Sequence, residues 1–200
     1  MKQSNISFDI DGILANFVRG FTRKAHAIFG TPVCDVSAQT HWMFEDFAEL
    51  GLTKDMCKVI WANIEVDPLF WENLDPFNVS AMDRINAIQN KVFITNRLGV
   101  DPKGQSERFL EKWGVKNPKV LVAAKKGPVA VEQFVLAHID DYYPNCTDIR
   151  TAVPECYTAL LTLPYNVCYH AEWKSAHTGE IVMSLDQFID ECDRRCLTVY

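Results

Sequence analysis

Two hundred residues with 48% hydrophobic and 23% charged side chains are typical of one globular domain with a modest insertion, which excludes a disordered chain or a fibre. The net charge of −6 argues against a surface that coats long nucleic acid. No apolar run approaches the ~18 residues of a membrane span, and the N-terminus lacks the apolar core of a signal peptide, so we expect a cytoplasmic protein without a membrane partner.

The N-terminal segment predicts a strand, a turn and a helix in that order. The apolar run 5–8 is a short strand candidate, and it leads straight into Asp9-Ile-Asp-Gly12, where the glycine suits a turn. From 14 to 29 the apolar residues recur at intervals of three and four, which is the periodicity of an amphipathic helix. Gly30 interrupts this pattern, so we expect the helix to end there.

The segment 33–78 has a different composition from the rest of the chain. Aromatic residues are dense in it, and prolines interrupt its end. Thr53 is a plausible N-cap for a helix that runs to about residue 63. We therefore expect this segment to form mostly short helices that are inserted into the main domain.

From residue 79 onward the pattern alternates between strands and helices. Apolar runs predict strands at 91–94, 120–124, 135–139 and 158–162. Helical stretches are expected at 80–90, 106–113, 128–134 and 184–196. This alternation predicts an α/β fold in which crossover helices join parallel strands. Parallel sheets bind their ligands at the carboxyl ends of the strands, so we expect a site at that edge.

Four of the expected strands end in polar residues that carry chemistry. These residues are Asp9 and Asp11 after the first strand, Thr95 after the second, Lys125 and Lys126 after the third, and Asp140 and Asp141 after the fourth. Clustered carboxylates repel, so they need a divalent cation, and all-oxygen ligands favour a hard ion such as Mg²⁺. A lysine and a hydroxyl opposite that ion would hold the oxygens of a phosphate group. Of two aspartates at positions i and i+2, one could attack phosphorus while the other handles the proton of the leaving group.

Each of these motifs also has a plain structural interpretation. An Asp-x-Asp-Gly sequence is common in turns, and Thr95 with its neighbours fits a turn or a helix cap. A Lys-Lys-Gly sequence is usually a solvated loop, and an Asp-Asp pair usually lies on the surface. The conjunction favours the functional interpretation, because all four motifs occur at strand ends of one chain in a workable order.

This set of motifs resembles that of the haloacid dehalogenase-like (HAD) phosphohydrolase superfamily. Asp9-Ile-Asp-Gly12 matches its first motif, Thr95 the second, Lys126 or Lys125 the third, and Asp140-Asp141 the fourth. The resemblance implies a three-layer α/β/α Rossmann-like core with a parallel sheet, formed by residues 1–16 and 79–200. It also implies a mostly helical cap over the active site, for which residues 17–78 provide the length.

Parts of the chain are also similar to the 5′(3′)-deoxyribonucleotidase family. The similarity lies in four runs: Asp11-Gly-Ile-Leu-Ala-Asn-Phe17, Ile60-Trp61, Phe70-Trp-Glu-Asn-Leu-Asp-Pro76 and Leu160-Leu-Thr-Leu-Pro-Tyr-Asn166. Asn96-Arg97 departs from the Thr-Ser pair usual in the better-known members, so the phosphate loop and the substrate preference can differ from theirs. By this resemblance the protein is expected to be a Mg²⁺-dependent phosphomonoesterase, a 5′-nucleotidase that forms an aspartyl-phosphate intermediate.

The resemblance also implies a role for each motif residue. Asp9 is the expected nucleophile and a Mg²⁺ ligand, while Asp11 is the expected acid and base and offers its backbone carbonyl to the metal. Thr95 and the Asn96 N–H would hold phosphate oxygens. Lys126, or Lys125 in its place, would neutralise the phosphate charge. Asp140 and Asp141 would complete the metal site, one directly and the other through water.

Further substrate contacts are expected from aromatic side chains and from Arg97. Phe17, Phe70 and Trp71 are the best candidates for a flat apolar slot that stacks on a nucleobase. The alternative is that they form the core of the inserted segment, since aromatic residues usually serve packing. Arg97 either contacts phosphate or sugar, or lies on the surface.

Three functions are compared on this basis. The first is the nucleotidase, and the second keeps its chemistry but acts on another small phosphate ester or on a polynucleotide end. The third is a non-catalytic nucleotide-binding module, against which the presence of both Asp9 and Asp11 argues, because binding alone needs no nucleophile. The expected partner is thus a small phosphate ester such as a nucleoside monophosphate. A homodimer is a further option, since dimers are common in this superfamily.

Overall fold

A computed structural model describes residues 4–176 and 180–200 of the chain. Its strands form one six-stranded sheet and are β1 (Asn5–Phe8), β2 (Lys91–Thr95), β3 (Val120–Val122), β4 (Val135–Asp140), β5 (Tyr157–Leu161) and β6 (Glu180–Val182). The order across the sheet is β3-β2-β1-β4-β5-β6, and every neighbouring pair in it runs parallel. The structure therefore confirms the predicted α/β fold with a parallel sheet.

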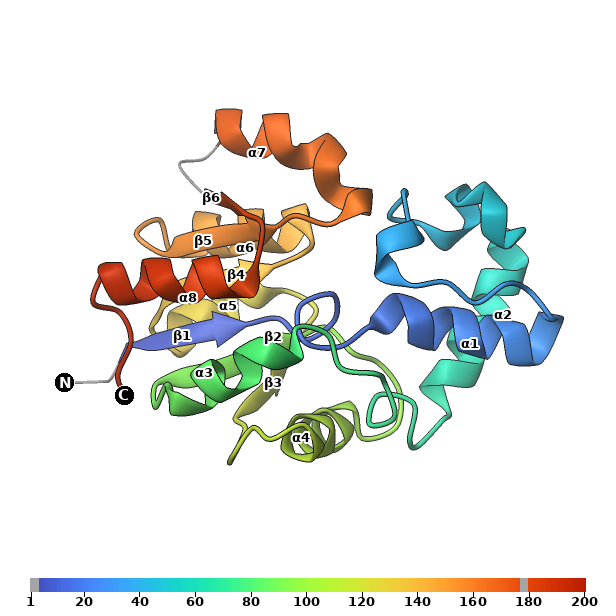
Figure 1. The fold of residues 1–200 in the computed structure, drawn as a ribbon, viewed down its shortest axis with the longest axis horizontal. Helices are drawn as coiled ribbons and strands as arrows, with labels where there is room; N and C mark the ends of the chain where they lie inside the picture. The colour runs from blue at the N-terminus through green and yellow to red at the C-terminus, as the bar shows by residue number, and fades with distance from the viewer. Residues whose placement is uncertain (1–3, 177–179) are drawn as a thin grey trace.

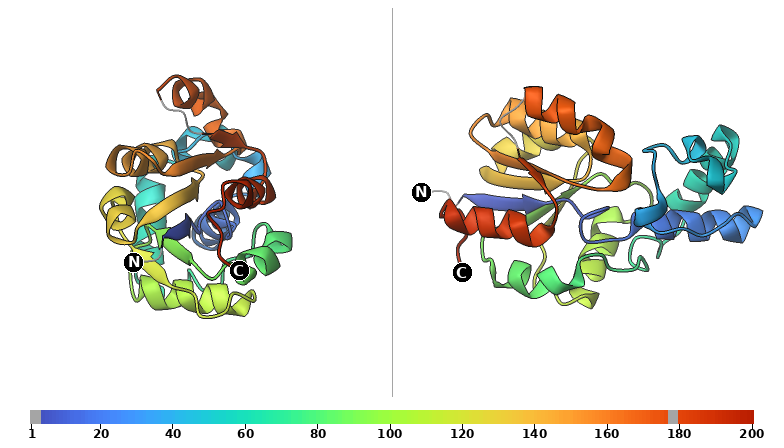
Figure 2. Two further views of the ribbon diagram at one scale, coloured as in Figure 1. Left: turned by 90° about the vertical axis from the view of Figure 1, so that its left-hand side faces the viewer. Right: turned by 45° about the horizontal axis from the view of Figure 1, so that its top comes forward.

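Helices cover both faces of this sheet, so the core has three layers (Figures 1 and 2). One face carries α5 (Lys126–Glu132) and α6 (Tyr143–Ala152), and the other carries α3 (Met82–Ala87) and α8 (Leu185–Arg194). At the two edges lie α4 (Pro102–Lys112), which packs beside β3, and α7 (His170–Ala176), which packs beside β6. The core also contains the 3₁₀ helices η4 (Val79–Ala81) and η5 (Pro164–Tyr169).

The central strands are apolar on both sides because both faces of the sheet are covered. Phe8 of β1 packs edge-on against Phe188 of α8, with 5.7 Å between the ring centroids. On the opposite face, Val92 and Ile94 of β2 belong to a buried cluster with Ile149 of α6. This double burial is why β1, β2 and β4 appear in the sequence as short, largely apolar runs.

Several helices begin at other residues than the sequence predicts, and local hydrogen bonds explain the two largest shifts, in α1 and α4. Helix α1 (Phe17–Phe29) begins at Phe17 rather than at residue 14 because the preceding residues form a turn, in which the Leu14 N–H donates to the Ile10 carbonyl at 2.8 Å. Helix α4 begins at Pro102 rather than at residue 106, because the Asp101 side chain accepts from the Gly104 N–H at 3.1 Å and caps the helix.

Several elements of the C-terminal part were not expected from the sequence, namely α6, η5, α7 and β6. Helix α6 shows why such an element is hard to find. Only Cys146 and Ile149 are buried along its ten residues, so its apolar periodicity is weak. Its place in the fold is decided by packing against α5, β4 and β5.

The inserted segment lies beyond the carboxyl ends of the strands, to one side of the sheet (Figure 1). It contains α1, α2 (Lys54–Glu65) and the short turns η1 (Val36–Ala38), η2 (Phe44–Asp46) and η3 (Ala48–Leu50). As expected, Thr53 caps α2 by accepting from the Met56 N–H at 3.2 Å. The limits of this unit at 17 and 78 stay a sequence prediction. Within the described ranges, no helix has the length and apolar character needed to cross a membrane.

Candidate active site

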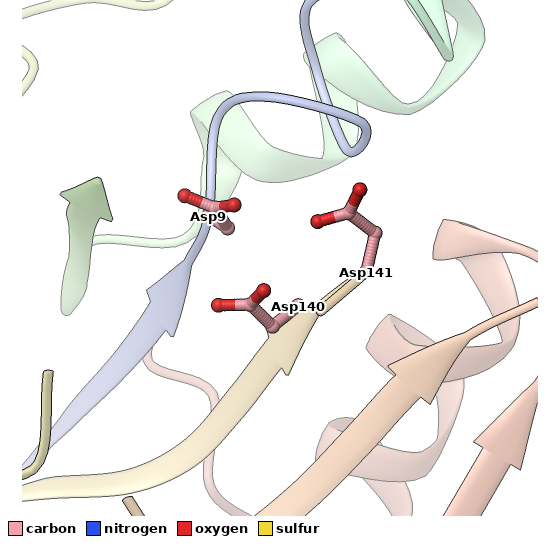
Figure 3. A group of neighbouring side chains, drawn as sticks. All are labelled: Asp9, Asp140 and Asp141. Atoms are coloured by element: carbon pink, nitrogen blue, oxygen red, sulfur yellow. The ribbon is translucent and has the colours of Figure 1, made fainter. Parts of the chain in front are cut away.

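Three aspartates meet at the carboxyl ends of two neighbouring strands (Figure 3). The register of β1 and β4 pairs Phe8 with Ile139, so Asp9 and Asp140 come next to each other at the point where both strands end. Each of Asp9, Asp140 and Asp141 offers a carboxylate oxygen that lies within 4.8 Å of the others. All three residues are buried, with at most 5% of their surface exposed. The sequence prediction that distant acids become neighbours is therefore confirmed.

Lys126 is the cation that this cluster contacts. It is the first residue of α5, its side chain is 1% exposed, and its Nζ lies 2.7 Å from Asp9 Oδ1 and 2.6 Å from Asp140 Oδ2. Lys125 is exposed and precedes the helix. Of the two lysines that the sequence left as alternatives, the structure brings Lys126 to the aspartates.

Burial and mutual repulsion dominate the electrostatics of the cluster. Burial raises the pKa of Asp9 to about 7, against the opposing effect of Lys126 and with further upward shifts from Asp140 and Asp11. Burial also raises the pKa of Asp141 well above its usual range, with Asp140 and Asp9 adding to the shift. Three carboxylates thus lie around one lysine, so the cluster holds more acidic groups than this single cation can pair. An all-oxygen cluster with excess negative charge is a chemically suitable donor set for Mg²⁺.

Asp140 differs from its neighbours because all its acceptor positions are in use. Its Oδ1 accepts from the Tyr142 N–H at 2.9 Å and from Asn145 Nδ2 at 3.2 Å. Its Oδ2 accepts from Lys126, and His138 Nε2 lies 3.1 Å away. Burial would raise the pKa of Asp140, but Lys126 and His138 lower it below its usual range. Asp140 is therefore an ionised anchor for Lys126 within the hydrogen-bond network.

His138 lies beneath the site and connects it to β1. The ring is fully buried, with Nδ1 2.7 Å from Ser7 Oγ and Nε2 3.1 Å from Asp140 Oδ2. Burial lowers the pKa of His138, so the ring is neutral. Because a carboxylate can only accept, we assign the proton to Nε2 and let Nδ1 accept from the Ser7 hydroxyl. His138 is not among the residues that the sequence motifs single out.

Asp141 is held by residues to which the sequence assigned no role. The Tyr165 hydroxyl donates a short hydrogen bond to Asp141 Oδ2, and Asn166 Nδ2 donates to the Asp141 carbonyl at 2.8 Å. Both partners lie in the run Leu160–Asn166, whose resemblance to a nucleotidase segment was the only available signal. Gly12 (φ +75°) passes so close that a Cβ at this position would collide with the Asp141 carboxylate. A glycine is thus required by both conformation and space.

Thr95 and Asn96 follow β2 at the same edge of the sheet. Thr95 is fully buried, and within the described residues its hydroxyl has no hydrogen-bond partner, although it lines the cavity described below. A buried hydroxyl without a partner is unfavourable unless a ligand completes it. Asn96 is exposed and also lines the cavity. Both therefore face the same cavity as Asp9 and Lys126, and their phosphate-binding role stays a prediction.

Asp11 points toward Arg97. Arg97 Nε lies 3.0 Å from Asp11 Oδ2 and its Nη2 lies 2.8 Å from Asp11 Oδ1, which is a two-point ion pair. The guanidinium side chain is fully buried, whereas 20% of the Asp11 side chain is exposed. Arg97 is therefore not a surface residue, which was one of the two alternatives from the sequence. Among the described residues, it also does not line the cavity.

A cavity of about 580 Å³ opens above the aspartates, between the strand ends and the inserted segment. Its lining includes Asp9, Asp11, Asp141, Thr95, Asn96, Lys125, Lys126, Phe17 and Trp71. Phe17 lies between two indoles, with ring centroids 5.6 Å from Trp61 and 5.7 Å from Trp71 and small interplanar angles. Phe70 is 7% exposed and packs edge-on against Trp71. It is not among the described residues that line the cavity, so it lies behind the predicted apolar slot.

Comparison with known proteins identifies the fold. No protein-family profile and no curated protein matches the sequence. A HAD family hydrolase from Deinococcus radiodurans R1, solved with bound phosphate and sodium, matches with a TM-score of 0.64 at 11% identity, covering 98% of both chains. A haloacid dehalogenase-like family hydrolase from Streptococcus pneumoniae has a TM-score of 0.56 at 10% identity, over 94% of this chain and 98% of its own.

An L-2-haloacid dehalogenase also matches, with a TM-score of 0.52 at 12% identity, over 94% of this chain and 99% of its own. The chain therefore has the fold of HAD-family hydrolases. At these identities the likeness speaks for the fold alone, and the fold is shared by proteins named for different substrates. The activity has to be argued from the side chains at the strand ends.

Proposed function

We propose that the protein is a Mg²⁺-dependent phosphomonoesterase, a 5′-nucleotidase that dephosphorylates (deoxy)ribonucleoside monophosphates. The observation that carries the proposal is the position of Asp9, a buried carboxylate that contacts Lys126, faces Asp141 and opens onto an aromatic cavity. The similar hydrolase from D. radiodurans was solved with bound phosphate and sodium, which supports the binding of an anion and a cation by this fold.

The metal would be held by the carboxylates of Asp9 and Asp141 together with the backbone carbonyl of Asp11. We prefer Asp141 to Asp140 as the direct ligand because both oxygens of Asp140 already accept hydrogen bonds, whereas Asp141 Oδ1 is not among the oxygens that do. When bound, Mg²⁺ would supply positive charge that offsets the repulsion between the anionic nucleophile and the anionic phosphate.

In the first step a carboxylate oxygen of Asp9 attacks phosphorus, and the bond between phosphorus and the ester oxygen breaks. Asp11 donates a proton to the departing oxygen, which leaves as the alcohol of the nucleoside. Lys126 neutralises charge on the phosphoryl oxygens, and the Thr95 hydroxyl and the Asn96 N–H hold them in line. The product of this step is an aspartyl-phosphate on Asp9.

In the second step water attacks the phosphorus of the aspartyl-phosphate. Asp11, now a carboxylate, accepts a proton from that water, and the bond between phosphorus and the Asp9 oxygen breaks. Inorganic phosphate leaves, and Asp9 returns as a carboxylate. Asp11 thus ends the cycle protonated, ready for the next ester, so that protons balance over the two steps.

The cavity supports a substrate with a flat apolar part. Its volume of about 580 Å³ lies in the range usual for small-molecule sites. Phe17 and Trp71 contribute apolar surface to its lining, and Phe17 is the more exposed of the two. A nucleobase would pack on the part of Phe17 that its neighbouring indoles leave open, and base–aromatic contacts contribute about 1–3 kcal/mol. Phe70 would support Trp71 from behind, because their rings pack edge-on at 4.9 Å.

Phosphate release from a panel of nucleoside monophosphates tests this proposal. The panel contains deoxy and ribo forms of each base and a simple sugar phosphate, each with Mg²⁺ or with a chelator. We expect Mg²⁺-dependent release that is faster from nucleotides than from the sugar phosphate. Asp9→Asn should abolish turnover, whereas Asp55→Asn, which changes an exposed carboxylate on α2, should leave it unchanged.

Three outcomes would count against the proposal. Turnover retained by Asp9→Asn would contradict the assigned nucleophile. Equal rates on the sugar phosphate and on nucleotides would instead favour a phosphatase for another small ester. A folded wild-type protein that binds nucleotides but releases no phosphate from any ester would favour the binding module.

A further inference from the structure

The ion pair between Arg97 and Asp11 has no place in the mechanism described so far. Sequence motifs assign Asp11 to proton transfer but say nothing about what orients its carboxylate. We propose that Arg97 is the positioning residue of Asp11, which holds that carboxylate at the leaving-group side of the cavity without touching the substrate. This inference rests on the proposed function, because it assigns a role within the same reaction.

The geometry of the pair is specific to arginine. Two parallel hydrogen bonds, at 3.0 and 2.8 Å, fix both the distance and the plane of the Asp11 carboxylate. A lysine could make only a point contact in this place. Asp11 follows β1 and Arg97 follows β2, and these strands are neighbours in the sheet. Two motifs that are 86 residues apart are thereby joined at one strand edge.

Arg97 is itself held from several sides, so it can serve as a fixed reference. Its Nη1 donates to Ser106 Oγ at 3.0 Å, and the Ser106 hydroxyl in turn donates to the Pro102 carbonyl at 2.6 Å. The guanidinium carbon lies 4.8 Å from the ring centroid of Trp71 and 5.6 Å from that of Phe109. These contacts from α4 and from the end of the inserted segment leave the side chain no exposed surface.

The burial of Arg97 favours a positioning role over a direct contact with the substrate. Asp11 lines the cavity and is partly exposed to it, whereas Arg97 lies behind Asp11 and is 1% exposed. A phosphate in the cavity would therefore meet Lys126 and Thr95, while the charge of Arg97 is directed at Asp11. The arrangement also balances charge locally, because the Arg97 guanidinium pairs with the Asp11 carboxylate.

The chemistry of the leaving group predicts for which substrates kcat would fall when Arg97 is replaced. A p-nitrophenolate leaves phosphorus without needing a proton, whereas the alkoxide of a nucleoside or a simple alcohol needs one as the bond breaks. A misplaced Asp11 should therefore slow the hydrolysis of alkyl phosphate esters and leave the hydrolysis of p-nitrophenyl phosphate almost unchanged. A merely structural arginine, or one that binds phosphate, would affect both esters alike.

The experiment compares kcat and KM on p-nitrophenyl phosphate and on a nucleoside 5′-monophosphate. The variants are Arg97→Gln, Arg97→Lys and Asp11→Asn, the double variant of Arg97→Gln with Asp11→Asn, and Arg108→Gln as the matched control. Arg108 is an exposed arginine of α4 whose ion pairs, with Glu72 and Asp101, lie outside the site. Thermal unfolding of each variant shows that it is folded, and Arg97→Lys keeps a buried cation should Arg97→Gln fail to fold.

We expect Arg97→Gln to lower kcat on the nucleotide about ten- to a hundredfold and on p-nitrophenyl phosphate less than about threefold, with KM unchanged on both. Arg97→Lys should lower kcat on the nucleotide by an intermediate factor. The double variant should be no slower than Asp11→Asn alone, because Arg97 acts through Asp11. Arg108→Gln should match the wild type.

Other results would overturn the inference. Arg97 would not act through Asp11 if Arg97→Gln lowered kcat equally on the two esters, or if it raised KM and left kcat unchanged. Fully additive losses of kcat in the double variant would show the same. An increase in kcat for Arg97→Gln would show that the pair restrains Asp11 instead of positioning it. If the wild type itself releases no phosphate from either ester, the proposed function fails, and this inference fails with it.

Discussion

Replacing Asp9 by Asn should change how the stability of the metal-free protein depends on pH. Burial and two neighbouring carboxylates raise the pKa of Asp9 from 3.8 to about 7 in the folded chain. Between these values the folded state keeps a proton on Asp9 that the unfolded state releases. The free energy of unfolding of the wild type therefore falls as the pH rises from about 4 to 7.

The size of this effect follows from the shift. A change from 3.8 to about 7 is roughly three pKa units, which corresponds to about 4 kcal/mol at pH values above 7. An asparagine at this position has no proton to lose. The stability of Asp9→Asn relative to the wild type should therefore increase by a few kcal/mol between pH 4.5 and pH 7.5.

Urea unfolding in the presence of a chelator, followed by tryptophan fluorescence at pH 4.5, 6.0 and 7.5, measures this difference. Asp55→Asn is the matched control, since Asp55 is exposed and its pKa is lowered by Lys58, so its substitution should not stabilise the protein as the pH rises. Saturating Mg²⁺ should remove most of the pH dependence of the wild type, because the cation then replaces the proton. A difference between Asp9→Asn and wild type that stays constant over this pH range would refute the account of an uncompensated buried carboxylate.

Three further predictions address neighbouring parts of the site. Gly12→Ala should abolish Mg²⁺-dependent stabilisation, measured as the shift in Tm on adding the metal, because its Cβ would displace the Asp141 carboxylate and its positive φ would be strained by about 1 kcal/mol. Lys126→Met should lower kcat about 10²–10³-fold, while Lys125→Met should change it far less, and comparable losses would contradict the assignment of Lys126. Phe17→Ala should raise KM for nucleotides more than for a simple sugar phosphate, and an unchanged ratio would place Phe17 in the core of the inserted segment.

The elements that build the site were predictable from the sequence because their local signals agree with their tertiary role. Strands β1, β2 and β4 are short apolar runs since both faces of the sheet are covered. The polar residues at the ends of these runs stay buried, because they contact one another or line the cavity at this edge of the sheet. Helix α6 was missed for the opposite reason, as most of its residues face solvent or other helices without a regular apolar repeat.

Side-chain directions within the site were beyond the reach of the sequence. Lys125 and Lys126 are chemically identical, and only the start of α5 turns Lys126 inward to Asp9. The sequence treated Arg97 as a substrate contact or a surface residue, whereas packing between Trp71 and Phe109 turns it toward Asp11.

The amino-acid sequence by itself determined which polar residues stand at the ends of parallel strands, because apolar runs and their polar ends are local features of the chain. Tertiary structure decided how those residues are used. Whether a carboxylate such as Asp140 is saturated by hydrogen bonds, or one such as Asp11 is paired with a buried cation, depends on partners distant in the chain. Such partners meet only when the sheet has formed and its two layers of helices have packed on it.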